Sequence, residues 1–190
     1  MGLTAGCATR IGEVAGAVLQ SVGLKGEALP SAKTVPLRMH AGFNLNAGED
    51  GQGNAVVVRM FKLREVAPFM SAPYVAFGNT SREREALGDS LMEVREVVLT
   101  PGQQLESSER LSGEAAFLGL VVLFRNPAPE RWRVAFARDD LDKAGAMIGM
   151  HRCAMTVTIG KVHGMNAAQL ALLTPTDCGG EQRPREAARD

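Results

Sequence analysis

Three histidines, His40, His151 and His163, are the residues of this chain best suited to acid–base or metal chemistry. His151 and His163 flank one apolar run and would lie about one strand length apart, too far to share a metal ion. His40 stands between apolar residues of an alternating run and is expected to face solvent. We therefore expect no metal site and no cofactor at these positions.

The densest carboxylate cluster is Arg138-Asp139-Asp140-Leu141-Asp142. A calcium loop spreads its oxygen ligands over about twelve residues, with a glycine midway and a final glutamate, and this run has no such continuation. The chain also has no Gly-x-Ser-x-Gly and neither glycine-rich nucleotide signature. The cluster is interpreted as a solvated turn, and the chain as a protein that is not an enzyme.

Bulk composition excludes several other classes of function. The 190 residues include 21 Lys and Arg against 21 Asp and Glu, so net charge favours neither nucleic acid nor an anionic surface. A single Trp and a single Tyr make stacking on nucleic acid strands improbable on composition. No apolar run approaches the roughly 18 residues needed to cross a bilayer. One globular domain is the natural count.

The first strand signals flank a long polar segment. Apolar residues alternate with polar or small ones at Leu37, Met39, Ala41, Phe43 and Leu45, which predicts a strand with one buried face. Val56–Leu63 predicts a second strand. Between them, 46–54 (NAGEDGQGN) suits neither helix nor strand, so we expect a hairpin with a long tip. A long surface loop with no partner remains an open alternative, because extra length adds little closure entropy.

Residues 64–91 interrupt the strand pattern with two prolines and a cap-like Asn79-Thr80-Ser81, which predicts one or two short helices. Strand signals then return at Met92–Thr100, Gln103–Leu111, Ala115–Arg125, Arg131–Ala137, Ala146–His151 and Ala154–Val162. The pattern predicts a mostly β fold, an antiparallel two-sheet sandwich of seven to eight strands with a helical insertion after the second.

The ends of the chain are expected to lie outside this sandwich. Apolar spacing between Ile11 and Val22 predicts a short N-terminal helix within a tether covering 1–36. The sandwich would occupy 37–165. Residues 166–190 would form a tail, with a helical turn or two at 166–173 and a polar end.

The order of the motifs resembles one known family. The motifs are Phe43-Asn44-Leu45-Asn46, the Val56–Leu63 strand with Arg59, Val94–Leu99 followed by Pro101-Gly102, Phe117–Phe124 followed by Arg125, and Arg131-Trp132-Arg133. Together they resemble the outer-membrane lipoprotein of the type VI secretion system, the TssJ family, over about 37–162. The resemblance implies a sandwich that lies in the periplasm and joins the secretion channel to the outer membrane.

The resemblance also implies a lipid anchor. Leu3-Thr4-Ala5-Gly6-Cys7 is similar to a lipobox, in which small residues precede a lipidated cysteine. It departs from the family pattern at Thr4, where an aliphatic residue is usual, and it lacks the charged start and apolar core of a signal peptide. The alternative is a chance run of small residues. Lipidation of Cys7 would hold the protein at the periplasmic face of the outer membrane.

If Cys7 carries lipid, Cys153 and Cys178 remain as an even pair in an oxidising compartment. A disulfide would tie the tail to the sandwich, and two free or buried thiols are the alternative.

The family's loop between its first two strands contacts the periplasmic domain of the inner-membrane component TssM, so the resemblance assigns the same partner here. The loop residues are Asn46, Ala47, Gly48, Glu49, Asp50, Gly51, Gln52 and Gly53. The carboxylates of Glu49 and Asp50 would suit a basic patch on TssM.

Two other functions stay open at this level. One is a transthyretin-like periplasmic sandwich that binds a small molecule or sugar. A deep pocket with convergent polar groups would support that function. The other is an enzyme with an unrecognised site, for which a titratable cluster with perturbed pKa values would speak.

Overall fold

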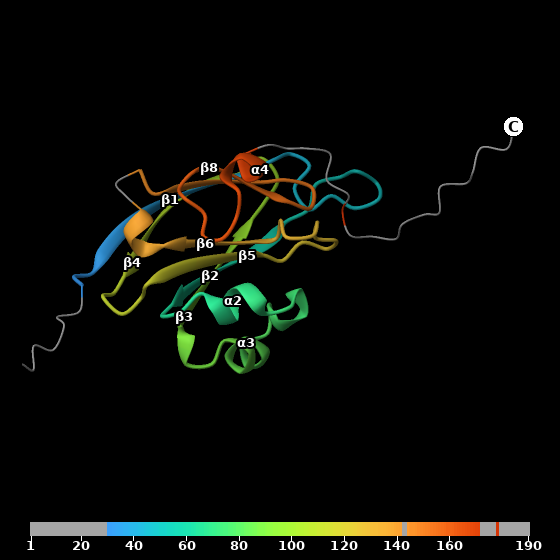
Figure 1. The fold of residues 1–190 in the computed structure, drawn as a ribbon. Helices are drawn as coiled ribbons and strands as arrows, with labels where there is room; N and C mark the ends of the chain where they lie inside the picture. The colour runs from blue at the N-terminus through green and yellow to red at the C-terminus, as the bar shows by residue number, and fades with distance from the viewer. Residues whose placement is uncertain (1–29, 142–143, 172–177, 179–190) are drawn as a thin grey trace, which may run out of the picture. The chain divides into compact units, whose positions relative to one another are not determined.

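Two four-stranded sheets form the body of the protein in a computed structural model that describes residues 30–141, 144–171 and 178 (Figure 1). One sheet has the order β4-β1-β7-β8, with β1 (Lys33–Ala41), β4 (Gln104–Leu111), β7 (Ala146–Met150) and β8 (Met155–Ile159). The other has the order β3-β2-β5-β6, with β2 (Val56–Leu63), β3 (Leu91–Leu99), β5 (Phe117–Val122) and β6 (Arg133–Ala137). The predicted two-sheet sandwich of seven to eight strands is confirmed.

Strand pairing is antiparallel except between β1 and β7, which run parallel from Leu37 opposite Ala146 to Ala41 opposite Met150. More than a hundred residues of chain separate these two strands, so their connection is long enough for a parallel pair. The sequence predicted an antiparallel sandwich, and this one pair departs from it.

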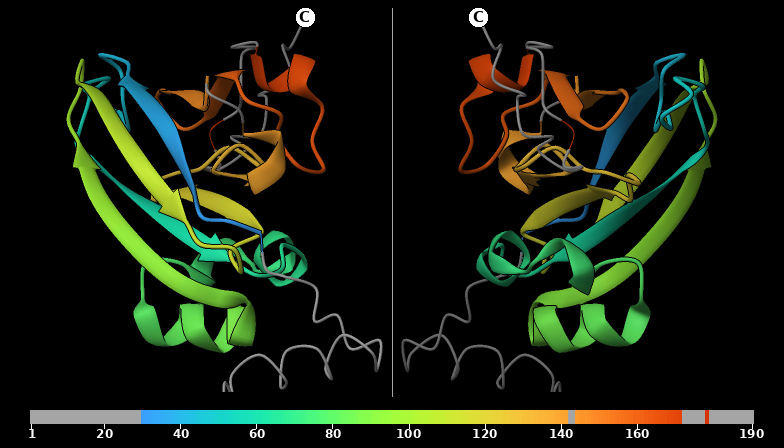
Figure 2. Two further views of the ribbon diagram at one scale, coloured as in Figure 1. Left: turned by 90° about the vertical axis from the view of Figure 1, so that its left-hand side faces the viewer. Right: turned by 90° about the vertical axis from the view of Figure 1, so that its right-hand side faces the viewer.

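The predicted hairpin of the first two strands is wrong. β1 and β2 belong to different sheets, so residues 42–55 cross from one sheet to the other instead of turning back within one (Figure 2). The alternating pattern correctly identified Leu37, Met39 and Ala41 as the buried face of β1. It could not identify the neighbour, because β1 pairs with β4 and β7, and β2 with β3 and β5, all distant in sequence.

Inward-facing side chains of both sheets form one apolar core, as period-two burial requires. In β1 the buried positions include Val35, Leu37 and Met39, and in β2 they include Val56 and Val58. The largest fully buried side chains are Phe61, Phe69, Phe136, Leu37, Met39, Leu45, Met60, Leu63, Leu87, Leu99, Leu111 and Leu118.

The helical insertion packs on the outer face of the β3-β2-β5-β6 sheet. It consists of α2 (Ala67–Ser71), η1 (Tyr74–Ala76), α3 (Thr80–Leu87) and η2 (Gly88–Ser90), as the prolines and the cap signal predicted (Figure 1). The rings of Phe69 and Phe77 each lie 5.5 Å from that of Phe61 on β2. Gly119 on β5 leaves room for this packing, because a Cβ there would approach Phe69 Cζ to 2.7 Å.

A polar anchor accompanies these apolar contacts. The Asn79 side chain accepts hydrogen bonds from the N–H groups of Ser81 and Arg82, as expected of an N-cap. Arg59 on β2 reaches the fully buried carboxylate of Glu83, with 2.6 Å between Nη2 and Oε2. Glu83 Oε1 accepts the N–H of Gly78 at 2.9 Å, so both carboxylate oxygens are bound.

A short helix near the C-terminus, α4 (Ala167–Ala171), lies within the predicted 166–173 segment, and η3 (Arg138–Asp140) follows β6. The predicted helix at 11–22 and Cys7 lie outside the described residues.

Candidate partner-binding surface

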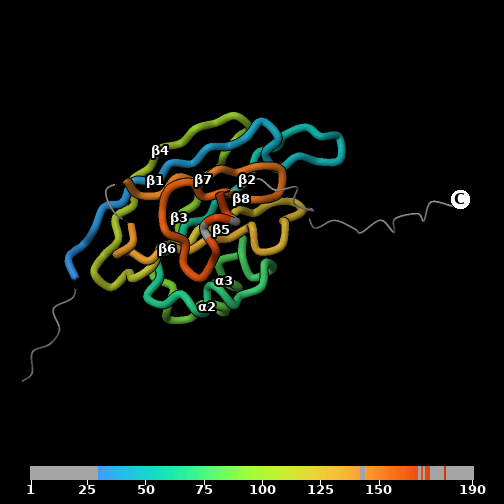
Figure 3. Tube along the Cα trace, turned by 45° about the horizontal axis from the view of Figure 1, so that its top comes forward, coloured from blue at the N-terminus to red at the C-terminus, as the bar shows by residue number. Residues whose placement is uncertain are grey.

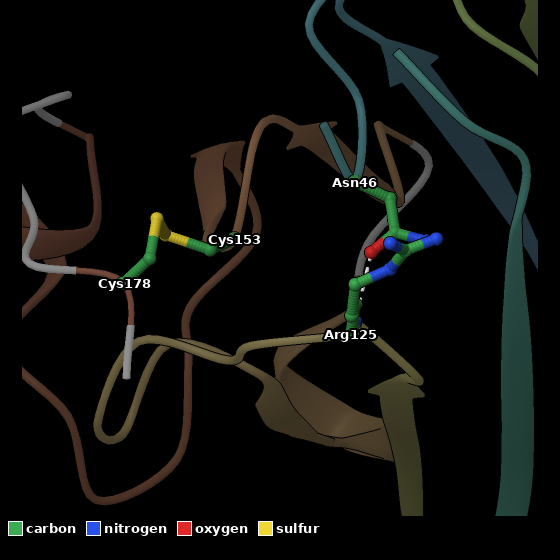
Figure 4. Close-up of a disulfide and its surroundings, with 4 residues drawn as sticks. All are labelled: Asn46, Arg125, Cys153 and Cys178. Carbon is green, nitrogen blue, oxygen red and sulfur yellow. Dashed lines mark hydrogen bonds between the residues drawn. A yellow bond between two sulfur atoms is a disulfide. The ribbon is translucent and has the colours of Figure 1, made fainter. Parts of the chain in front are cut away.

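Asn46 fixes the neck of the segment that crosses between the sheets. Its backbone is left-handed, with φ of 47°, and the residue is only 8% exposed. The side-chain Nδ2 donates to Ala55 O at 3.0 Å, and Oδ1 accepts the backbone N–H of Arg125 at 2.8 Å (Figure 4). Its own N–H donates to His151 O at 3.1 Å. Asn46 therefore binds three separate parts of the chain.

Beyond this neck the loop closes on itself. Gly48 N–H donates to Gln52 O at 3.3 Å, and Gly51 N–H donates to Gly48 O at 3.1 Å. Asp50 Oδ1 accepts the N–H of Gln52 at 3.1 Å. Glycine suits position 51 because φ is 73° there. These contacts give the tip a defined shape.

The structure brings all eight predicted loop residues, 46–53, onto this one segment but in different environments. Asn46 and Gly48 are buried, whereas Glu49, Asp50, Gly51 and Gln52 are exposed. The segment that carries the exposed residues loops out at one end of the sandwich (Figure 3). The segment thus divides into a buried neck and an acidic tip.

The turn between β3 and β4 lies beside this loop. Ala41 N–H donates to Gln103 O at 2.9 Å, and Gly102 N–H donates to Ala41 O at 3.1 Å. Side views place the loop and the turn at the same end (Figure 2). A Cβ at Gly53 would lie 2.9 Å from Pro101 Cγ, so the two segments approach closely.

Sequence reasoning missed Phe43 and the Pro101-Gly102 turn as members of this surface. Phe43 was expected to face the core as part of the first strand, but β1 ends at Ala41 and Phe43 is 88% exposed. The physical reason is the turn at 42–46, in which Leu45 N–H donates to Gly42 O and breaks the alternation. Gly42 was the available signal of that break.

The disulfide joins the tail to the sandwich. Cys153 and Cys178 are bonded, with Cα atoms 5.6 Å apart, and Cys153 O accepts the N–H of Ala128 at 2.9 Å (Figure 4). Cys153 lies between β7 and β8, so the bond fixes residue 178 against the β8 side of the sheet.

The three histidines lie in different environments. His40 is exposed, and the ring of His163 packs edge-on against Phe117 with centroids 5.2 Å apart. His151 is half-buried, with Nε2 3.0 Å from Thr156 Oγ1. Burial, and then the nearby charge of Arg131, lower the pKa of His151 below its usual value. Within the described ranges, no three His, Cys, Asp or Glu side chains come together as a metal site.

The Asp139–Asp140 region forms η3. In it Arg138 is buried and donates to Gly113 O at 3.1 Å, while Asp140 pairs with Lys161 at 3.1 Å.

Trp132 is 8% exposed and packs against Tyr74 and Phe77 instead of offering an open platform. A hollow of about 450 Å³ lies over β1 and β4 and is lined by Pro36, Leu37, Arg38, Glu106, Ser107 and Ser108. Among the described residues, no helix has the length and apolar character to cross a membrane.

Comparisons with known proteins agree with this architecture. Residues 33–153 match the family model described as "Type VI secretion lipoprotein, VasD, EvfM, TssJ, VC_A0113". No curated protein sequence matches the chain.

Solved structures give the same answer. A chain of a "Type VI membrane complex" is 28% identical, with a TM-score of 0.60, over 67% of this chain and 98% of that one. The lipoprotein TssJ1 from Pseudomonas aeruginosa is 26% identical, with a TM-score of 0.58, over 70% and 98%. The structure described as the C-terminal domain of the type VI secretion protein TssM from EAEC gives 25% identity and a TM-score of 0.57 over 67% and 98%. The chain belongs to the TssJ family of type VI secretion lipoproteins.

Proposed function

We propose that this protein is anchored by a lipid on Cys7 in the periplasmic face of the outer membrane and binds the periplasmic domain of TssM. It thereby joins the trans-envelope channel to the outer membrane. Its work is mechanical and not catalytic. The observation that carries the proposal is the ordered acidic loop at one end of a sandwich that belongs to the TssJ family.

The direction of β1 supports a division of labour between the two ends of the sandwich. The chain from Cys7 reaches the sandwich at Lys33, the first residue of β1, and the loop begins after its last residue, Ala41. Nine strand residues at ~3.3 Å per residue separate these points by about 26 Å. The chain that leads from Cys7 therefore joins one end of β1 and the loop follows the other end, which leaves the loop available to a partner.

The loop suits protein recognition because its shape is already fixed. Internal hydrogen bonds at Gly48, Gly51 and Gln52 reduce the ordering that binding would require. The exposed carboxylates of Glu49 and Asp50 suit a basic patch on TssM and would speed the encounter. One similar structure is described as a "Type VI membrane complex" and another as the C-terminal domain of TssM. Both descriptions support TssM as the partner.

Cell fractionation tests the anchor. The full chain is produced behind a lipoprotein signal sequence, and Cys7→Ser is compared with Cys178→Ser, which also removes a cysteine, and with it the disulfide, but not the proposed lipid site. Cys7→Ser should move the protein to the soluble periplasm in folded form, whereas Cys178→Ser should stay with the outer membrane. Retention of Cys7→Ser in the outer membrane would contradict the anchor.

Affinity capture with the purified periplasmic domain of TssM tests the partner. The wild type and Cys7→Ser should both be captured, because the loop does not depend on the lipid. Failure of both to bind, with the sandwich folded by circular dichroism, would contradict the proposed partnership.

A further inference from the structure

Phe43 is an aromatic side chain that the fold holds in solvent. It is 88% exposed, whereas the other strongly exposed large apolar side chains among the described residues, Val75 and Val98, are 69% and 55% exposed. The residues on its C-terminal side, Leu45 and Asn46, are buried. The exposure of Phe43 is therefore local and does not reflect a loose segment.

Backbone hydrogen bonds on both sides fix its position. Gly42 N–H donates to Met150 O at 2.8 Å, and Leu45 N–H donates to Gly42 O at 3.0 Å. Across the gap, Gly102 N–H donates to Ala41 O at 3.1 Å. These bonds connect the turn at Phe43 to β7 and to the β3–β4 turn.

The ring rests on the Pro101-Gly102 turn. A Cβ at Gly102 would come within 2.8 Å of Phe43 Cε1, so glycine at 102 leaves the space that the ring fills. Gly102 also has φ of 77°, a conformation that glycine adopts without strain. Gly102 in the Pro101-Gly102 turn thus forms a ledge against the Cδ1, Cε1 and Cζ side of the ring, and most of the ring remains open to solvent.

Such a side chain has the properties of a binding anchor. An aromatic ring can bury roughly 150–250 Å² on association. Anchors that are already ordered lose little entropy, and binding energy concentrates in a few such residues. Because Phe43 is held by its neighbours' backbone, burying its ring against a partner would require little rearrangement.

We propose that Phe43 on its Pro101-Gly102 ledge inserts into an apolar pocket of the TssM periplasmic domain and is the main energetic anchor of this surface, with the 49–52 tip as its polar rim. This inference rests on the proposed function. The inference adds to the proposed function by separating the energetic anchor, Phe43, from the acidic tip.

A protein pocket suits this site better than a lipid surface. Phe43 follows the end of β1 that lies about 26 Å from Lys33, where the chain from Cys7 arrives. The same crossing segment carries charges of both signs, since Glu49 and Asp50 form the tip and Arg125 Nη1 lies beside Gly48. A mixed polar rim round an apolar centre is typical of protein interfaces, and the two carboxylates would oppose an anionic membrane.

Titration calorimetry of the full chain with the TssM periplasmic domain tests the anchor. Phe43→Ala should weaken binding by about 30-fold, the equivalent of ~2 kcal/mol. Phe43→Trp should stay within about threefold of wild type, because a large ring still fits an apolar pocket. Val98→Ser removes another exposed apolar side chain and should leave the affinity unchanged. The unfolding midpoint of each variant should match wild type, since only exposed atoms change.

Other outcomes would overturn the anchor or assign the Phe43 ring to another binding partner. Wild-type affinity in Phe43→Ala, while wild type binds TssM, would overturn the anchor and leave the partnership standing. Absence of wild-type binding would overturn both. Loss of binding to anionic vesicles in Phe43→Ala, with TssM affinity intact, would assign the ring to a lipid surface instead, and a change confined to self-association would assign it to a second copy of this chain.

Discussion

The side chain of Asn46 accepts the backbone N–H of Arg125 at 2.8 Å, joining the crossing segment to residues that follow β5 (Figure 4). The two residues are 79 apart in sequence, and this single contact connects the loop to the end of β5 in the β3-β2-β5-β6 sheet. The same side chain donates to Ala55 O, and its backbone is left-handed.

Replacing Asn46 should therefore destabilise the fold through two separable effects. Asn46→Gly loses both side-chain hydrogen bonds but tolerates the positive φ, and should lower the free energy of unfolding by about 2 kcal/mol. Asn46→Ala adds backbone strain and should lower it by about 1 kcal/mol more. Urea denaturation of both variants measures this difference. If Ala is as stable as Gly, the left-handed backbone at this position is not a constraint.

The ion pair of Arg59 with Glu83 should hold the helical insertion on its sheet. Glu83 is fully buried, so Arg59→Ala leaves a carboxylate without its cation and should destabilise the protein by about 3 kcal/mol or more. The double variant Arg59→Met with Glu83→Leu should regain most of this loss. Denaturant unfolding of the single and double variants gives the coupling energy.

The matched control is Glu93→Gln, which breaks a more exposed pair with Lys62 on the same sheet. Its effect should stay within about 1 kcal/mol. A control as damaging as Arg59→Ala would show that burial is not what makes the Arg59 pair important.

Ionisation of Tyr74 should lower the stability of the fold at high pH. Burial raises the pKa of Tyr74 from 10.0 to about 12, and its hydroxyl donates to Phe124 O at 2.6 Å. Because the unfolded chain ionises first, the contribution of Tyr74 to stability should be constant below pH 10 and fall as pH rises from about 10 to about 12.

Tyr74 is the sole tyrosine of the sequence, so the absorbance of tyrosinate reports on it alone. The titration midpoint of the folded protein should lie well above that of the urea-unfolded protein. Tyr74→Phe should remove the decline in stability over the same pH window. Coincident midpoints in folded and unfolded protein would contradict the buried hydroxyl.

The Cys153–Cys178 disulfide closes a loop with a sequence separation of 25. In the chain-entropy model a loop of this size is worth about 3 kcal/mol. Protein matured in the periplasm should show two thiols after reduction that are absent before it, and reduction should lower the unfolding midpoint. Free thiols at both positions before reduction would rule the bond out of the mature protein.

Local patterns predicted the elements of this fold well. Alternation in the first strand, and apolar runs between turn signals elsewhere, located the strands. The prolines with Asn79 located the insertion, because each of these signals depends on neighbouring residues. Pairing depends on contacts remote in sequence, so the parallel β1–β7 pair and the separation of β1 from β2 could not be predicted.

The candidate surface was predicted only in part, for the same reason. Composition located the polar tip at Glu49 and Asp50. Phe43 was assigned inward because its alternation with Leu37 and Met39 continued past the point where the strand ends. The Pro101-Gly102 ledge needed the three-dimensional proximity of two turns.

The tip of the loop should tolerate shortening while its neck is kept. Because β1 and β2 are not a hairpin, the neck residues Asn46 and Asn54 must stay, and only the tip can be shortened. Gly48 and Gln52 already face each other across one hydrogen bond. Replacing Glu49-Asp50-Gly51 with a two-residue Asn-Gly turn should therefore keep the fold.

The affinity of this shortened variant for the periplasmic domain of TssM, measured by titration calorimetry beside wild type, tests the role of the loop most directly. Binding should be at least about tenfold weaker, equivalent to ~1.4 kcal/mol, with an unchanged unfolding midpoint. Wild-type affinity in the folded, shortened variant would contradict the claim that the acidic tip of this loop takes part in binding TssM.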